Sequence, residues 1–186
     1  MRDVRPIRGV VALVALVLLS ACASRNDLTL QPADLSGIDV VRGPAPAYRN
    51  AVSPAPVSVG RDTGTPWTAR FGTTQVQQAL METLLAARLG TAQSGRFRLD
   101  ATLLTLERPY AGFAMTVTAT IAYRLTDSQT GAVVYNQTIT TIGSASLHDA
   151  ITNENRLRIA DERAVQANLR RLVEDLYSLP EPPRRG

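Results

Sequence analysis

The clearest pattern in the chain is a strict alternation of apolar and polar residues between Phe113 and Leu125. Every second residue from Phe113 onward is apolar, and the intervening positions carry mainly Thr and Ala. Because successive side chains of a strand point to opposite faces, this period of two predicts a strand with one buried face. Its polar face would present Thr116, Thr118 and Thr120.

Similar alternations flank this strand. Apolar residues alternate over 97–103, and Val133, Tyr135 and Ile139 follow a turn-forming stretch at 127–131. The connections are too short for crossovers, so the three strands should form an antiparallel meander. An earlier short strand is predicted at 35–41, and another is compatible with residues 57–59.

Two segments show helical spacing of apolar residues. The first is predicted from Thr73 or Thr74, either of which could cap it, to about Leu89, with Gly90 as a stop signal. The second is predicted from about Asn155 to Tyr177, and prolines follow it closely.

The predicted order is β-α-β-β-β-α, in a single domain over residues 35–179. The sheet has one apolar face and each helix one apolar stripe, which favours a two-layer α+β fold with both helices on that face. Residues 42–66 are rich in proline and should form an extended loop. Residues 180–186 should form a disordered tail.

The N-terminus has the pattern of an export signal. Three arginines precede an apolar run over 9–19, and Leu19-Ser20-Ala21-Cys22 follows. The run is shorter than the roughly 20 residues that cross a bilayer. We therefore predict that residues 1–21 are a signal peptide and that 22–34 form a lipidated tether. An uncleaved membrane helix, or an ordinary signal with an incidental cysteine, is the alternative.

Leu-Ser-Ala-Cys resembles the lipobox of bacterial lipoproteins. This resemblance implies a diacylglycerol on the sulfur of Cys22, acylation of its new amino group and anchoring in a membrane. By the same resemblance, Ala23 in place of Asp favours the periplasmic face of the outer membrane. This covalent lipid is the only non-protein group expected, because no cofactor-binding motif is present.

The composition excludes several kinds of chemistry. The chain has one Cys and one His, His148, so neither an internal disulfide nor a His-rich or two-cysteine metal site can form. It has no Lys, which excludes Schiff-base catalysis and a phosphate-binding lysine. P-loop, GxGxxG and GxSxG motifs are absent. The formal charge of +4 is not gathered into a basic stripe with aromatics, so nucleic-acid binding is not expected.

Clusters of polar residues near the C-terminus suggest structural rather than catalytic roles. Ser144, Ser146, His148 and Asp149 are close in sequence, whereas catalytic triads are normally assembled from distant segments. We therefore interpret them as a polar loop after the last strand. The acidic pairs 161–162 and 174–175 are expected on the solvent side of the last helix. No catalytic residue is assigned, and the chain is not expected to be an enzyme.

The polar face of the predicted sheet is the best candidate for a binding surface. Thr138 and Thr140 of the last strand would join the three threonines of its neighbour. If Leu125 pairs with Val133, Thr120 lies opposite Thr138 and Thr118 opposite Thr140. This face is either a simple solvated surface, since Thr suits strands, or a docking platform for another envelope protein, with strand addition at an edge.

The chain also resembles a group of small envelope proteins. The lipobox, the Leu28–Pro32 segment soon after it, and the helix–three-strand–helix layout are similar to the YajG-type lipoproteins. The layout is similar as well to auxiliary lipoproteins of lipid-trafficking ABC transporters and to LpoB-like activators of peptidoglycan synthases. The resemblance implies a non-enzymatic role in the cell envelope and assigns no functional residue beyond Cys22.

Three functions remain open from the sequence. The first is a membrane-tethered binding or scaffolding protein with an unidentified envelope protein as partner. The second is an accessory subunit of a lipid or lipopolysaccharide transport system. The third is an envelope enzyme, such as an acyltransferase or hydrolase.

Overall fold

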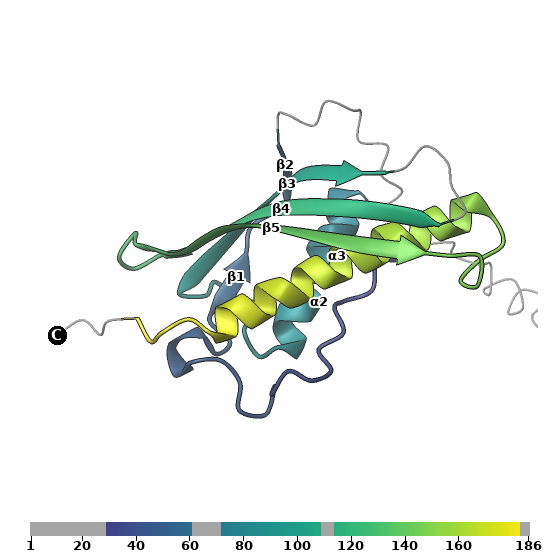
Figure 1. Cartoon of the computed structure of the whole chain (residues 1–186). Coiled ribbons are helices and arrows are strands. Elements are labelled where there is room, and N and C mark those ends of the chain that lie inside the picture. Colours follow the sequence, from purple (N-terminus) through teal and green to yellow (C-terminus); the bar gives the residue numbers. More distant parts are fainter. Residues whose placement is uncertain (1–28, 61–71, 109–113, 183–186) are drawn as a thin grey trace, which may run out of the picture.

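The computed structural model of the chain describes residues 29–60, 72–108 and 114–182 (Figure 1). Cys22 and its flanking segments therefore lie outside the described residues. The elements are the short 3-10 helix η2 (Pro46–Tyr48), strands β1 (Val52–Pro54) and β2 (Ser58–Val59), helix α2 (Thr73–Ala86), strands β3 (Phe97–Glu107), β4 (Met115–Asp127) and β5 (Val133–Ala145), and helix α3 (Asn153–Tyr177).

The strands form one five-stranded sheet in the order β1-β3-β4-β5, and β2 also pairs with β3. β3, β4 and β5 are antiparallel to one another, which confirms the predicted meander. β1 and β2 run parallel to β3. A parallel connection needs a crossover, and α2 supplies it between β2 and β3.

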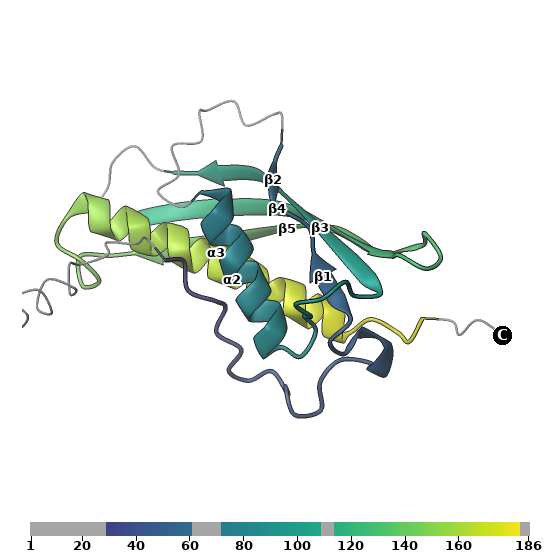
Figure 2. The same ribbon diagram turned by 180° about the vertical axis from the view of Figure 1, so that it is seen from behind.

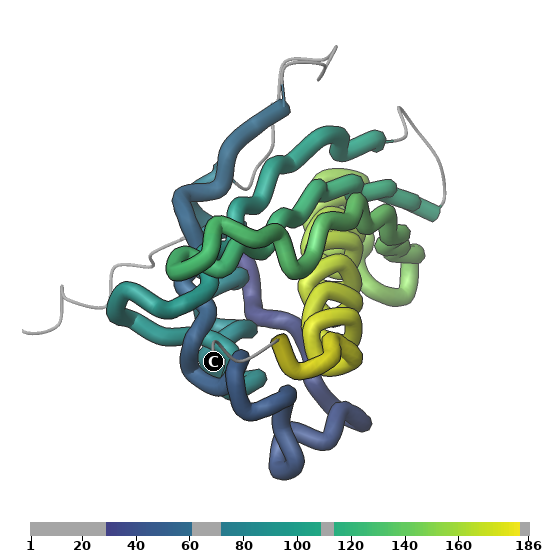
Figure 3. Tube along the Cα trace, turned by 90° about the vertical axis from the view of Figure 1, so that its left-hand side faces the viewer, coloured from purple at the N-terminus to yellow at the C-terminus, as the bar shows by residue number. Residues whose placement is uncertain are grey.

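Both helices lie on one side of the sheet, which confirms the predicted two-layer α+β architecture (Figures 1 and 2). Viewed from the end, α2 and α3 lie below the strands and side by side (Figure 3). The apolar face of β3 and β4 and the apolar stripes of both helices share one buried cluster. Its largest fully buried members include Tyr123, Phe97, Leu80, Leu84, Leu99, Leu103, Leu125, Leu169 and Leu172.

The prediction of a first strand at 35–41 was wrong. This segment forms turns: the Asp34 carboxylate accepts hydrogen bonds from Ser36, the Ile38 N–H bonds Leu35 O, and Gly37 has φ +80°. The first strand is instead Val52–Pro54, inside the proline-rich stretch predicted to be loop. Proline is tolerated there because β1 lies at an edge of the sheet.

The predicted tether extends less far than residues 22–34. Leu30 and Ala33 are buried, and the Ala33 N–H donates to Thr83 Oγ1 over 2.9 Å. The predicted tail at 180–186 is likewise held at its start, since Tyr48 Oη donates to Pro180 O and the Glu181 carboxylate accepts from the Ala47 N–H. Both ends of the described chain therefore pack on the domain.

Candidate functional site

The five threonines chosen from the sequence all lie on the face of the sheet away from the helices. Thr120 pairs with Thr140, and their hydroxyl oxygens are 3.1 Å apart. Thr118 lies opposite Ile142, Thr116 opposite Ser144 and Thr138 opposite Ala122. The predicted face is thus correct, but the predicted cross-strand partners were wrong.

The register differs because of the turn and a bulge. Thr126, rather than Leu125, pairs with Val133, and a bulge at Val134 then brings Leu125 opposite Tyr135. The turn and the bulge together shift the register between β4 and β5 by two residues from the predicted one. Because side chains alternate between the faces of a strand, a shift by two keeps Thr138 and Thr140 on the predicted face. The bulge places Val133 opposite Thr126, on the outer face, where it is 41% exposed. Its predicted place on the apolar face was therefore wrong.

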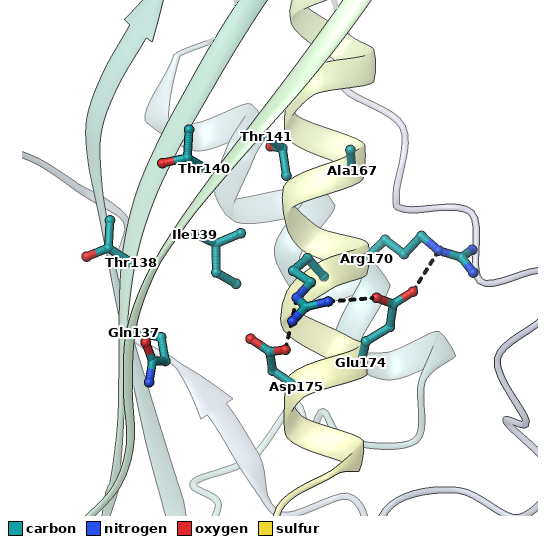
Figure 4. Close-up of a pocket in the computed structure, with 10 residues that line it drawn as sticks. Gln137, Thr138, Ile139, Thr140, Thr141, Ala167, Arg170, Glu174 and Asp175 are labelled. Atoms are coloured by element: carbon teal, nitrogen blue, oxygen red, sulfur yellow. Dashed lines mark hydrogen bonds and ion pairs between the residues drawn. The ribbon is translucent and has the colours of Figure 1, made fainter.

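β5 is the outermost strand of the sheet, and among the described residues it pairs only with β4. Its other edge is bordered by a groove of about 600 Å³ between the strand and α3 (Figure 4). The strand wall comprises residues 137–141, and the helix wall comprises Ala167, Arg170, Arg171, Glu174 and Asp175. Ile139 points toward the helix, while Thr138 and Thr140 point away from it. We call this feature the β5 groove.

Ion pairs hold the helix wall of the β5 groove. Arg170 Nε lies 3.0 Å from the Glu174 carboxylate, and Arg171 Nε lies 3.0 Å from that of Asp175. Tyr135 Oη donates to Asp175 over 2.8 Å, linking β5 to the helix. Burial is the main cause that raises the pKa of Tyr135, and the carboxylate of Asp175 adds to it, so this hydroxyl remains a proton donor. The groove therefore offers both charge signs beside a free strand edge.

The groove ends where α3 closes onto the strand. A Cβ atom on Gly143 would overlap Ala160 O and the backbone of Ala164, so only glycine allows this approach. Thr141 Oγ1 donates to Ala164 O over 2.8 Å at the same place. The helix thus touches β5 near its C-terminal end and diverges from residue 141 backward, which opens the groove.

A buried polar residue supports the floor beside the groove. Asn168 is fully buried on α3, and its amide donates to Ile139 O, Ala119 O and Thr141 Oγ1. Its side-chain oxygen accepts from Tyr123 Oη. These bonds fix the distance between α3 and the two strands that carry the threonines, β4 and β5.

Of the polar cluster at 144–149, Ser146, His148 and Asp149 lie in a closed turn, as the sequence interpretation proposed, whereas Ser144 belongs to β5. The Asp149 carboxylate accepts from the N–H and hydroxyl of Ser146, and its other oxygen accepts from Arg163 over 2.6 Å. The Arg163 guanidinium is the main reason that the pKa of Asp149 is lowered. This carboxylate therefore orients the turn and an arginine, not the ring of His148.

The prediction that Asp161 lies on a solvated face was wrong. Asp161 is fully buried and accepts two hydrogen bonds from Arg108, at 2.9 and 2.7 Å. Arg108 follows β3 and retains 20% of its side-chain exposure. Asp175 is half-buried in the groove wall, where it accepts from Tyr135 Oη. Within the residues described, no group of three or more His, Cys, Asp or Glu side chains could hold a metal ion.

Comparisons with known proteins identify the fold. No protein-family model matches the chain, and no curated protein matches it by sequence. Among solved structures, protein XCC0632 from Xanthomonas campestris, of family DUF330, matches with a TM-score of 0.53 and 20% identity, over 72% of this chain and 90% of that one. The PelC dodecamer from Paraburkholderia phytofirmans matches with a TM-score of 0.51 and 18% identity, over 73% and 93%.

A minor lipoprotein from Acinetobacter baumannii matches with a TM-score of 0.42 and 14% identity, over 72% of this chain and 98% of that one. At these identities the first two matches show a shared fold. They leave the activity of this chain to be argued from its own residues.

Proposed function

We propose that this chain is a lipid-anchored, non-catalytic binding protein of the bacterial envelope. In this proposal Cys22 carries the lipid, and the free edge of β5 receives an extended segment of another envelope protein. The observation that carries the proposal is the edge of β5 beside the β5 groove, with which no other strand of the described residues pairs.

The lipobox at Leu19–Cys22 supports the anchor, and its short apolar run supports cleavage rather than membrane spanning. Across 29–60, 72–108 and 114–182, no helix has the length and apolar character needed to cross a membrane. Ala23 supports the outer membrane as the destination, by resemblance to lipoprotein sorting. The YajG-type resemblance supports the same envelope role.

Strand addition suits the chemistry of the β5 edge. An exposed edge presents unpaired N–H and C=O groups that an extended peptide can satisfy. Alternate side chains of that peptide would face the threonines and the β5 groove. Ile139 and Ala167 would accept small apolar side chains there, and the ion pairs of Arg170 and Arg171 would accept polar ones.

The transport alternative requires a site for lipid. The β5 groove is walled largely by charged and polar side chains, and a second hollow of about 520 Å³ is lined by Asp39, Arg42, Arg49, Tyr177 and neighbouring Gly, Pro and Ala residues. Acyl chains would remove these charged groups from water, which is costly even for charges that are paired. The lining therefore favours a peptide over a lipid as ligand.

The test is site-specific photo-crosslinking in cells that make the full chain. A photoreactive residue in place of Thr138 or Thr140 should capture a partner as a discrete higher-mass band. The matched control replaces Gln78, which is exposed on α2, away from β5.

Capture from Thr138 and Thr140 but not from Gln78 supports the proposal, and mass spectrometry then identifies the partner. Capture only from Gln78, or from no position, contradicts it. A band containing two copies of this chain would instead indicate that β5 mediates self-assembly and not binding of another protein. PelC is likewise seen as an assembly, a dodecamer.

A further inference from the structure

The loop that joins β5 to α3, residues 146–152, exposes two large apolar side chains. Leu147 is 53% exposed and Ile151 is 89% exposed. Water penalises each of them, and nothing in the described domain covers them. We call this segment the apolar loop.

Several backbone groups of the apolar loop are hydrogen-bonded within the loop or to α3. The N–H groups of Asp149 and Ala150 bond Ser146 O, and the Ser146 N–H bonds the Asp149 carboxylate. Arg156, which is buried, donates to the carbonyls of Ala150 and Ile151. Satisfied backbone groups can approach an apolar medium at little cost, whereas free ones cannot.

Arg156 also fixes the shape of the apolar loop. Its guanidinium bonds the Asn153 side chain as well as the two carbonyls, so the loop is tied to the first turn of α3. Thr152 caps that helix by accepting from the Asn155 N–H. The two apolar side chains are therefore presented by a braced turn rather than by a loose chain.

The chain that leads back to Cys22 leaves the domain toward this end. Asp34 O accepts from Arg170, and Pro32 O accepts from Gln166, so the segment runs along α3 toward its N-terminus as it approaches Thr29. Figure 1 shows the apolar loop at that end of α3 and the β4–β5 turn at the opposite end. The seven residues at 22–28 span at most about 25 Å when extended.

We infer that the apolar loop inserts Leu147 and Ile151 into the membrane surface that holds the Cys22 lipid. The partner is thus a lipid bilayer, and the contact rests on the proposed anchoring at Cys22. Two attachments, one covalent and one through the loop, would fix the orientation of the domain. The β5 groove, which borders the C-terminal half of α3, would then project from the bilayer surface into the periplasm.

The test adds vesicles of phosphatidylethanolamine and phosphatidylglycerol to the full lipidated protein. Lipidation consumes the thiol of Cys22, so an introduced cysteine is the sole site for an environment-sensitive NBD label. Ile151→Cys should show blue-shifted emission and at least about a twofold loss of iodide quenching when vesicles are added. Gln129→Cys, on the exposed β4–β5 turn at the opposite end, is the control and should show neither change.

A second variant separates insertion from mere proximity. Leu147→Asp combined with Ile151→Cys should abolish the blue shift while circular dichroism stays unchanged, because Leu147 is exposed. Equal iodide quenching at positions 151 and 129 in sedimented protein would overturn the inference and leave the anchor intact. Failure of the protein to sediment with vesicles would instead overturn the proposed anchoring, and the inference with it.

Discussion

The two halves of α3 meet β5 in different ways. The N-terminal half, to Ala164, lies directly on the strand, with Gly143 and alanines at the contact and the buried Asp161–Arg108 pair beside it. The C-terminal half packs leucines and valines into the main core but stands away from the edge of β5. The β5 groove therefore lies where α3 diverges from β5. The close contact of Gly143 with Ala160 and Ala164 sets that divergence.

This difference teaches where a partner can enter the sheet. The opposite edge carries β1 and β2, two short strands with Pro54 in the first and Pro56 between them, and short strands and prolines are common protections against strand pairing. The β5 edge is long and continuous, and α3 leaves its middle open. The proposed binding edge is thus a consequence of how one helix crosses one strand.

The largest effect should come from filling the close contact. Gly143→Val would drive its side chain into the backbone of Ala160 and Ala164, so α3 must lift from β5. We expect a loss of about 3 kcal/mol or more in the free energy of unfolding, measured by urea denaturation. Ser144→Val, next along the strand but exposed on the outer face, is the control and should change stability little. Equal stability of the two variants would contradict the tight contact.

Removing the buried carboxylate should be the next most costly change. Asp161→Ala leaves the guanidinium of Arg108 without its bidentate partner, with 20% of its side chain exposed to water. We expect a loss of about 2–3 kcal/mol, below the usual cost of breaking a fully buried pair because of that exposure. The double variant with Arg108→Met should recover part of the loss. No recovery would mean that the two residues act independently.

The sequence predicted the α+β fold because its periodicities report burial directly. The alternation in β4 and the apolar stripe of α3 follow from which side chains leave water, and both appear as predicted. The first strand failed because β1 has only three residues, one of them proline, and forms by pairing with the distant β3. Short edge strands depend on such tertiary pairing more than on local preference.

The site was predicted in part for the same reason. The threonine face follows from alternation, but strand order does not, so the β5 groove was not found. Gly143 was an available signal, since an isolated glycine within a strand indicates close approach by another backbone. Asp161 was misplaced because its partner, Arg108, is far away in sequence, and adjacent acidic residues resemble a solvated face.

The ion pair of Arg96 with Asp127, at the start of β3, should contribute less to stability than the pair of Arg108 with Asp161 at its end, and its contribution should depend on pH. The Arg96 guanidinium is the main cause that lowers the pKa of Asp127. Since the folded-state pKa is depressed, this pair stabilises the fold above about pH 4, the unfolded-state value, and the contribution disappears as pH falls through the folded-state pKa.

Arg96→Gln should therefore lower the urea midpoint at pH 7, and the difference from the parent chain should close in strongly acidic buffer. The cost should be smaller than that of Asp161→Ala, because Arg96 is more exposed than Arg108. Arg98→Gln, from an exposed pair with Asp100, should change the midpoint little at either pH. A difference that persists in acid would show that Arg96 acts through packing instead.

The smallest effect should come from the hydroxyl that crosses the β5 groove. Tyr135→Phe removes the 2.8 Å bond to Asp175, but the carboxylate keeps Arg171 Nε at 3.0 Å and remains partly open to water. We expect a loss of about 0.5–1 kcal/mol in the free energy of unfolding, measured as for Gly143→Val. A loss as large as that of Gly143→Val would mean that the C-terminal half of α3 is fixed to β5 as firmly as the N-terminal half. In that case the groove would be a rigidly closed seam, and strand addition at this edge would require α3 to detach.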